Sequence, residues 1–151
     1  MKEWESLDDV MDFAIDQEQA AADFYTKLSV SARHASMREV LESFAAEELR
    51  HKQKLVAIKE QGATKLVSSV VVPDLKVVDY LIDIEPSDDM SYQDSLVVAM
   101  KLEKRAFRLY SDMAAMAEDE AIRQSLLALA NEEAKHKLHF EIEYDDSVKE
   151  N

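Results

Sequence analysis

A set of glutamate and histidine residues occurs twice in this sequence with unchanged spacing. In each copy, a glutamate precedes the glutamate of an E-x-x-H motif by 30 residues and its histidine by 33 residues. Carboxylate oxygens and imidazole nitrogens are typical ligands of first-row metals, and a repeated ligand set indicates two equivalent half-sites. We therefore predict one dinuclear metal site built from both copies. Its six predicted ligands are Glu18, Glu48, His51, Glu103, Glu133 and His136, each 85 residues from its counterpart.

The surroundings of these glutamates predict that they are buried. Alanines flank Glu18 and Glu103 at the three- and four-residue spacing of one helix face. Four buried carboxylates without compensation would repel one another and take up protons. Two divalent cations would balance the four negative charges and leave both histidines neutral. Hard carboxylates combined with imidazole suit iron or manganese, and zinc is a possible substitute.

The composition predicts an all-α fold that positions these residues on long helices. Of 151 residues, 47% are apolar, and only one glycine and two prolines interrupt the chain. We expect one helix from a capping box at Ser6 to a turn near Ala32, and a second from a box at Ser36–Glu39 to Gly62. A third helix is expected from Ser91 to the acidic break 118–120, and a fourth from there to about residue 146.

The predicted helices form two duplicated hairpins, 6–61 and 91–146, joined by a long crossover over residues 62–90. The crossover has an aliphatic, β-branched stretch before Pro73, which favours an extended path, and a candidate short helix at 74–84. It is long enough to travel the length of a helix, so the third helix can run parallel to the second. We therefore expect a single domain, 1–151, in which four helices bring the ligands to one level.

Charge and cysteine content exclude several classes of function. The net charge of −14 disfavours nucleic acid and anionic membranes as partners. The N-terminal residues lack an apolar signal core and no run is long enough to span a membrane, so we expect a cytoplasmic protein. The absence of cysteine excludes disulfides, thiolate metal sites and iron–sulfur ligation. Any redox chemistry therefore belongs to a metal held by oxygen and nitrogen.

The repeated motifs resemble those of the ferritin-like superfamily and, within it, rubrerythrin-type di-iron proteins that lack a rubredoxin domain. The resemblance covers residues 6–145 and is carried by Glu18, Glu103 and the runs Phe44–His51 and Ala130–His136. It implies two iron ions per chain, bridged by the glutamates of the two E-x-x-H motifs. It also implies that Glu18 and Glu103 are terminal or bridging ligands and that each histidine binds one iron. Tyr25 and Tyr110 would donate hydrogen bonds to the carboxylates from outside the ligand shell.

The resemblance implies a non-haem di-iron oxidoreductase that reduces hydrogen peroxide or oxygen, in the manner of an oxidative-stress peroxidase. Electrons would come from an external donor such as rubredoxin, and the chain would form a homodimer. The sequence departs from the family at Ala106, where rubrerythrins carry a further glutamate. The alternatives are a ferritin-like iron-binding protein with ferroxidase, storage or sequestration function, an oxidase of an organic substrate, and a metal-free helical interaction module.

Other residues of the same types have simpler interpretations. A single E-x-x-H motif is weak, because Glu and His at this spacing often form an exposed helical pair. Glu47 and Glu132 lie about 100° around the helix from the predicted ligands, so we expect surface or supporting positions rather than ligation. His34 and His139 are expected to face solvent. For Tyr25 and Tyr110, ordinary core packing is the alternative to a supporting role at the metal.

Overall fold

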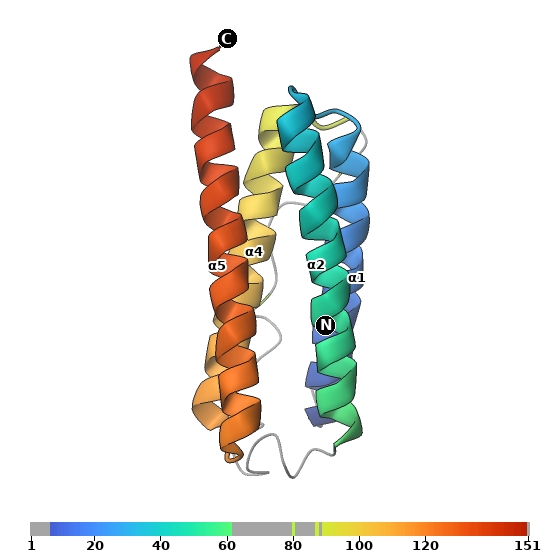
Figure 1. Cartoon of the computed structure of the whole chain (residues 1–151), viewed down its shortest axis with the longest axis vertical. Helices are drawn as coiled ribbons and strands as arrows, with labels where there is room; N and C mark the ends of the chain where they lie inside the picture. Colours follow the sequence, from blue (N-terminus) through green and yellow to red (C-terminus); the bar gives the residue numbers. More distant parts are fainter. Residues whose placement is uncertain (1–6, 62–79, 81–86, 88, 151) are drawn as a thin grey trace.

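The computed structural model of the chain describes residues 7–61, 80, 87 and 89–150, and in these ranges the protein is a bundle of four α-helices (Figure 1). The helices are α1 (Leu7–Ser29), α2 (Ala35–Glu60), α4 (Tyr92–Met116) and α5 (Glu120–Lys149). The predicted all-α four-helix bundle is confirmed. None of the helices in the described ranges combines the length and apolarity needed to cross a lipid bilayer.

The four helices form two antiparallel hairpins, α1 with α2 and α4 with α5, which lie side by side (Figure 1). In the view of Figure 1, α2 ends at the lower end of the bundle and α4 begins at the upper end. The two helices therefore run in the same direction, as predicted. The expected crossover over 62–90, with its extended stretch and short helix, lies almost entirely outside the described residues, and the single domain over 1–151 stays a prediction.

The helix starts test the predicted capping signals. Ser91 caps α4, its hydroxyl accepting a hydrogen bond from the Asp94 backbone N–H at 3.0 Å. Asp119 caps α5 in the same way, accepting from the Ile122 N–H at 3.0 Å. Both caps satisfy a backbone donor that has no partner within the helix.

The capping box predicted at Ser36–Glu39 is wrong, because α2 begins earlier. The Arg38 N–H donates to the His34 carbonyl at 3.0 Å, so helical hydrogen bonding already starts at His34. The Arg38 side chain also donates to the Ser29 carbonyl at 3.2 Å and so closes the turn between α1 and α2. The turn, rather than a serine cap, sets where this helix starts.

The apolar core is divided into two clusters by a polar layer. One cluster contains Met11 and Leu55 near the start of α1 and the end of α2, and the other contains Leu41 and Phe140 at the opposite end. On every helix the predicted ligands fall between the residues of the two clusters. The ligand layer is therefore enclosed above and below by tightly packed apolar side chains.

Polar contacts also tie the two hairpins together at the end of the bundle where α5 finishes. The Arg33 guanidinium, from the turn after α1, lies 3.2 Å from the Glu143 carboxylate on α5. The Tyr92 hydroxyl at the start of α4 donates to the same carboxylate at 2.8 Å. The Arg33 contact connects the two hairpins, and the Tyr92 contact joins α4 to α5 within the second hairpin.

Candidate metal centre

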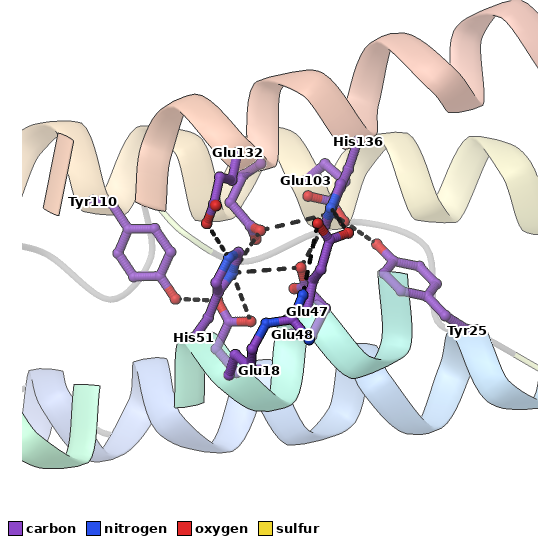
Figure 2. Close-up of polar contacts among 11 residues, drawn as sticks. Glu18, Tyr25, Glu47, Glu48, His51, Glu103, Tyr110, Glu132 and His136 are labelled. Atoms are coloured by element: carbon purple, nitrogen blue, oxygen red, sulfur yellow. Dashed lines mark hydrogen bonds and ion pairs between the residues drawn. The ribbon is translucent and has the colours of Figure 1, made fainter. Parts of the chain in front are cut away.

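The six predicted ligands meet in the middle of the bundle, where their side chains point toward one another (Figure 2). They are at most 3% exposed. They form two groups, and within each group one potential ligand atom from every residue lies within 4.8 Å of the others. The first group is Glu18, Glu48, His51 and Glu133, and the second is Glu48, Glu103, Glu133 and His136. Because Glu48 and Glu133 belong to both groups, the arrangement could hold two metal ions that share these carboxylates.

The hydrogen-bonding state of these residues fits a metal. Buried polar atoms in proteins are nearly always hydrogen-bonded, and an orphaned atom requires an explanation. In the described part of the chain, seven buried side-chain atoms lack a hydrogen-bond partner, and six of them come one each from the six predicted ligands. The seventh is the Arg123 Nε, near the start of α5. Two cations, one in each group, would give every one of the six orphaned atoms a partner.

Each histidine turns its Nδ1 toward the carboxylates of the six predicted ligands and its Nε2 toward a carboxylate outside this set. The His51 Nδ1 lies 3.0 Å from Glu133 Oε1, and its Nε2 lies 2.5 Å from the Glu132 carboxylate. The His136 Nδ1 lies 3.1 Å from Glu48 Oε1, and its Nε2 lies 2.9 Å from the Glu47 carboxylate. An outer carboxylate that accepts from Nε2–H leaves the Nδ1 lone pair facing inward, which is the tautomer that binds a metal.

The two imidazoles have different neighbours despite the repeat. The Phe44 ring stacks on the His136 ring with 3.9 Å between centroids, whereas its counterpart 85 residues later is Leu129. The two rings of His51 and His136 lie nearly parallel, 6.2 Å apart. An aromatic wall therefore restricts the movement of one histidine more than that of the other.

The two buried tyrosines support the glutamates of the opposite repeat. The Tyr25 hydroxyl on α1 donates to Glu103 on α4, and the Tyr110 hydroxyl on α4 donates to Glu18 on α1. Burial and the nearby carboxylates raise the pKa of both tyrosines well above its usual value. Both hydroxyls therefore stay protonated and remain donors. In Figure 2 the two rings flank the carboxylate cluster on opposite sides.

The metal-free cluster holds protons that a metal must displace. Burial, followed by repulsion from neighbouring carboxylates, raises the pKa of Glu48 and of Glu133 well above the usual value. Burial alone would lower the pKa of His136, but Glu103 and Glu48 raise it to about 10. Protonated carboxyl and imidazolium groups cannot coordinate a cation through the protonated atom.

We expect metal binding to release protons, and metal affinity to fall as the pH is lowered from 8 to 6. Carboxyl groups with raised pKa values and a protonated histidine must all lose protons before they can coordinate. The measurement is a titration of metal-free protein with Zn²⁺ in weakly buffered solution containing a pH indicator. Binding at pH 7 without any proton release would contradict the protonation states described above.

We expected Glu47 and Glu132 at the surface or in supporting positions. In the structure both support a predicted ligand. Each is partly exposed and accepts from a histidine of the other repeat. Their spacing of 85 residues, equal to that of the ligands, was the sequence signal that the two glutamates occupy equivalent positions. His34 and His139 are exposed, as predicted, although the His139 ring also meets the edge of Phe44.

We expect Glu132→Ala to weaken metal binding in the group that contains His51 by at least about tenfold, without removing the ligand itself. The alanine leaves the His51 ring free to rotate and to move its proton to the inward nitrogen. Competitive titration with Co²⁺, followed by visible absorption, measures the affinity. Glu42→Ala is the control, because Glu42 is exposed on α2. Equal affinities in the two variants would show that the outer carboxylate does not orient the histidine.

Comparison with protein families gives one result that bears on the whole chain. A family model described as Rubrerythrin matches residues 9–144, which include all four helices except their outermost residues. Neither curated proteins nor solved structures gave a significant match. The match covers nearly the full length of a chain whose helices carry a buried cluster of glutamates and histidines. The chain therefore belongs to the rubrerythrin family.

Proposed function

We propose that the chain is a rubrerythrin-like non-haem di-iron oxidoreductase that reduces hydrogen peroxide with electrons from a separate donor protein. The observation that carries this proposal is the buried layer in which six ligands each leave one atom without a partner. In this proposal Glu48 and Glu133 are shared by two iron ions, and the other four residues each serve one ion. Four carboxylates balance two divalent ions, so the loaded site is close to neutral in the reduced state.

The chain's own residues hold the geometry and the protons of this centre. Tyr25 and Tyr110 keep Glu103 and Glu18 in place by donating to one carboxylate oxygen and leaving the other free. Glu47 and Glu132 keep the histidines in the ligating tautomer. When bound, two ferrous ions would supply the two electrons that convert one peroxide and two protons into two waters. The sequence contains no cysteine that could hold a rubredoxin-type iron centre, and in this proposal the replacement electrons come from another protein.

The size of the space beside the site favours a very small substrate. A cavity of about 20 Å³ lies against Glu18 and Glu103, between α1 and α4. This volume holds one water-sized molecule. An organic substrate does not fit it without a large rearrangement of the bundle, so peroxide or oxygen is the better match than the substrate of an organic oxidase.

The test is metal content by mass spectrometry on anaerobically prepared protein, followed by stopped-flow oxidation with peroxide and with oxygen. The proposal expects about two iron ions per chain and faster oxidation by peroxide than by oxygen, with turnover when a donor such as reduced rubredoxin is added. Oxidation mainly by oxygen, with uptake of further iron and assembly into a large shell by size-exclusion chromatography, would instead establish iron storage. A chain that binds no iron would refute both functions.

A further inference from the structure

The walls of the small cavity beside the candidate metal centre change from acidic at its floor to cationic at its outer end. The floor consists of buried residues that include the four predicted glutamate ligands, and Ala21 and Ala106 form part of the wall. The lining residues that are partly exposed are Phe13, Gln17, Leu102, Arg105 and Ala106. The cavity therefore runs from the carboxylate layer toward the surface between α1 and α4.

Arg105 spans this outer end. From α4 it donates a hydrogen bond to the side-chain oxygen of Gln17 on α1, and its guanidinium carbon lies 5.9 Å from the centre of the Phe13 ring, also on α1. It is the only basic residue among the described residues that line the cavity. Its hydrogen-bond partner in the described structure is an amide and not a carboxylate, so its charge is not neutralised by an ion pair.

The repeat that defines the ligands breaks down at this bridge. The counterpart of Arg105 in the first copy is Ala20, and the counterpart of Gln17 in the second copy is Leu102. The duplication therefore builds a symmetric ligand layer but provides only one arginine at the cavity mouth. Among the described residues, no hydrogen bond or ion pair of the six ligands involves this bridge: Glu18 and Glu103 are held by tyrosines, and the two histidines by outer glutamates.

Charge and size together indicate what the bridge does. Four glutamates balance two divalent ions, so Arg105 is an additional positive charge at the entrance to a site that is close to neutral in its reduced state. A guanidinium offers several N–H donors to an anion and keeps its charge at any pH of interest. The cavity of about 20 Å³ admits water. A ligand of two or three heavy atoms needs the Arg105–Gln17 bridge to open.

We propose that Arg105 is a specificity-determining residue that closes the cavity mouth and holds small anionic ligands, of the azide or hydroperoxide type, against the metal centre. This inference rests on the proposed di-iron function. Arg105 discriminates by charge, while the methyl groups of Ala21 and Ala106 set the size of ligand that the cavity accepts.

The test compares an anionic and a neutral probe of similar size in the iron-loaded full chain. Azide affinity is measured by absorbance in the oxidised protein, and nitric oxide affinity by absorbance in the reduced protein. Arg105→Gln is the main variant, because glutamine keeps much of the length and can still bond to Gln17. Arg105→Lys is the rescue variant, and Lys104→Leu is the control, because Lys104 is the exposed neighbour and its loss changes the charge by the same amount.

We expect Arg105→Gln to weaken azide binding by about tenfold, because a hydrogen bond to a charged group is lost. Nitric oxide affinity should change by less than about twofold. Arg105→Lys should recover most of the azide affinity, and Lys104→Leu should behave as the original chain. Ala106→Val, which fills the cavity, should weaken both probes. Each of these results supports the assignment.

Other results would overturn it. Equal azide affinity in Arg105→Gln and in the original chain would show that Arg105 has no role in specificity. An equal loss of azide and nitric oxide affinity would show that Arg105 only maintains the structure of the bundle. Ala106→Val without effect on either probe shows that ligands do not use this cavity. Iron content is measured first in every sample. If the original chain binds iron and Arg105→Gln leaves azide affinity unchanged, only this inference is refuted. If the original chain binds no iron, both the proposed function and this inference are refuted.

Discussion

Replacing Glu48 by alanine is expected to lower the metal content from about two ions per chain to none. Glu48 is one of the two carboxylates shared by both groups of potential ligands. Its removal takes a ligand from each group at once and leaves each with three. Low coordination together with a new cavity in a tightly packed layer disfavours both ions.

The matched comparison is His51→Ala, because His51 belongs to only one group. The second group stays complete in this variant, so about one ion should remain. Glu42→Ala, an exposed change on the same helix, should retain both ions. Stoichiometry is measured by titration with Co²⁺ and by mass spectrometry of the iron-loaded protein. If Glu48→Ala keeps both ions, or His51→Ala loses both, the two overlapping groups do not describe the site.

Replacing Glu48 by glutamine should make the metal-free protein more stable, although it damages the site. Burial and three neighbouring carboxylates raise the pKa of Glu48, so its charged form is disfavoured in the fold. Glutamine has nearly the same shape and no charge. Glutamine removes the free-energy cost of either protonating this carboxyl group or burying its charge on folding, which should raise the free energy of unfolding by about 1–3 kcal/mol. Thermal unfolding in the presence of a chelator measures this as a rise in Tm.

The same substitution should change how stability depends on pH. A carboxyl group whose pKa is raised on folding binds more protons in the folded state, so the metal-free chain loses stability as the pH rises above the unfolded value of about 4.5. The raised pKa of His136 acts in the same direction, because the stabilisation by its protonated form is lost as the pH rises through about 10. The Tm of metal-free protein should therefore fall between pH 6 and pH 9, and fall less in Glu48→Gln.

Metal should reverse the ranking of these two proteins. A ligand that binds only the folded state raises stability according to its concentration and affinity. Zn²⁺ should therefore stabilise the original chain strongly and Glu48→Gln weakly. Glu42→Gln, at an exposed position, controls for the loss of one surface charge. A metal-free Glu48→Gln variant that is less stable than the original chain would show that this carboxylate contributes more through contacts than it costs through repulsion.

The helices and the ligands were predictable because both depend on short-range spacing. His51 stands three positions after Glu48, which places both on one face of any helix. The scarcity of glycine and proline leaves few ways to interrupt such helices. The start of α2 was not predictable from its serine, because a turn closed by Arg38 sets that boundary. Arg105 and Gln17 carried no signal either, since neither belongs to a repeated motif.

The sequence by itself determined the all-α class, the six converging side chains and the equivalence of the two halves, because each follows from composition or from a fixed spacing along the chain. The tertiary structure decided which residue supports which. Tyr25 donates to Glu103 and not to Glu18 seven residues away on its own helix, and His51 pairs with Glu132 from the other hairpin. These partners are 78 and 81 residues apart. Contacts over such separations depend on how the hairpins pack, and no local periodicity encodes that packing.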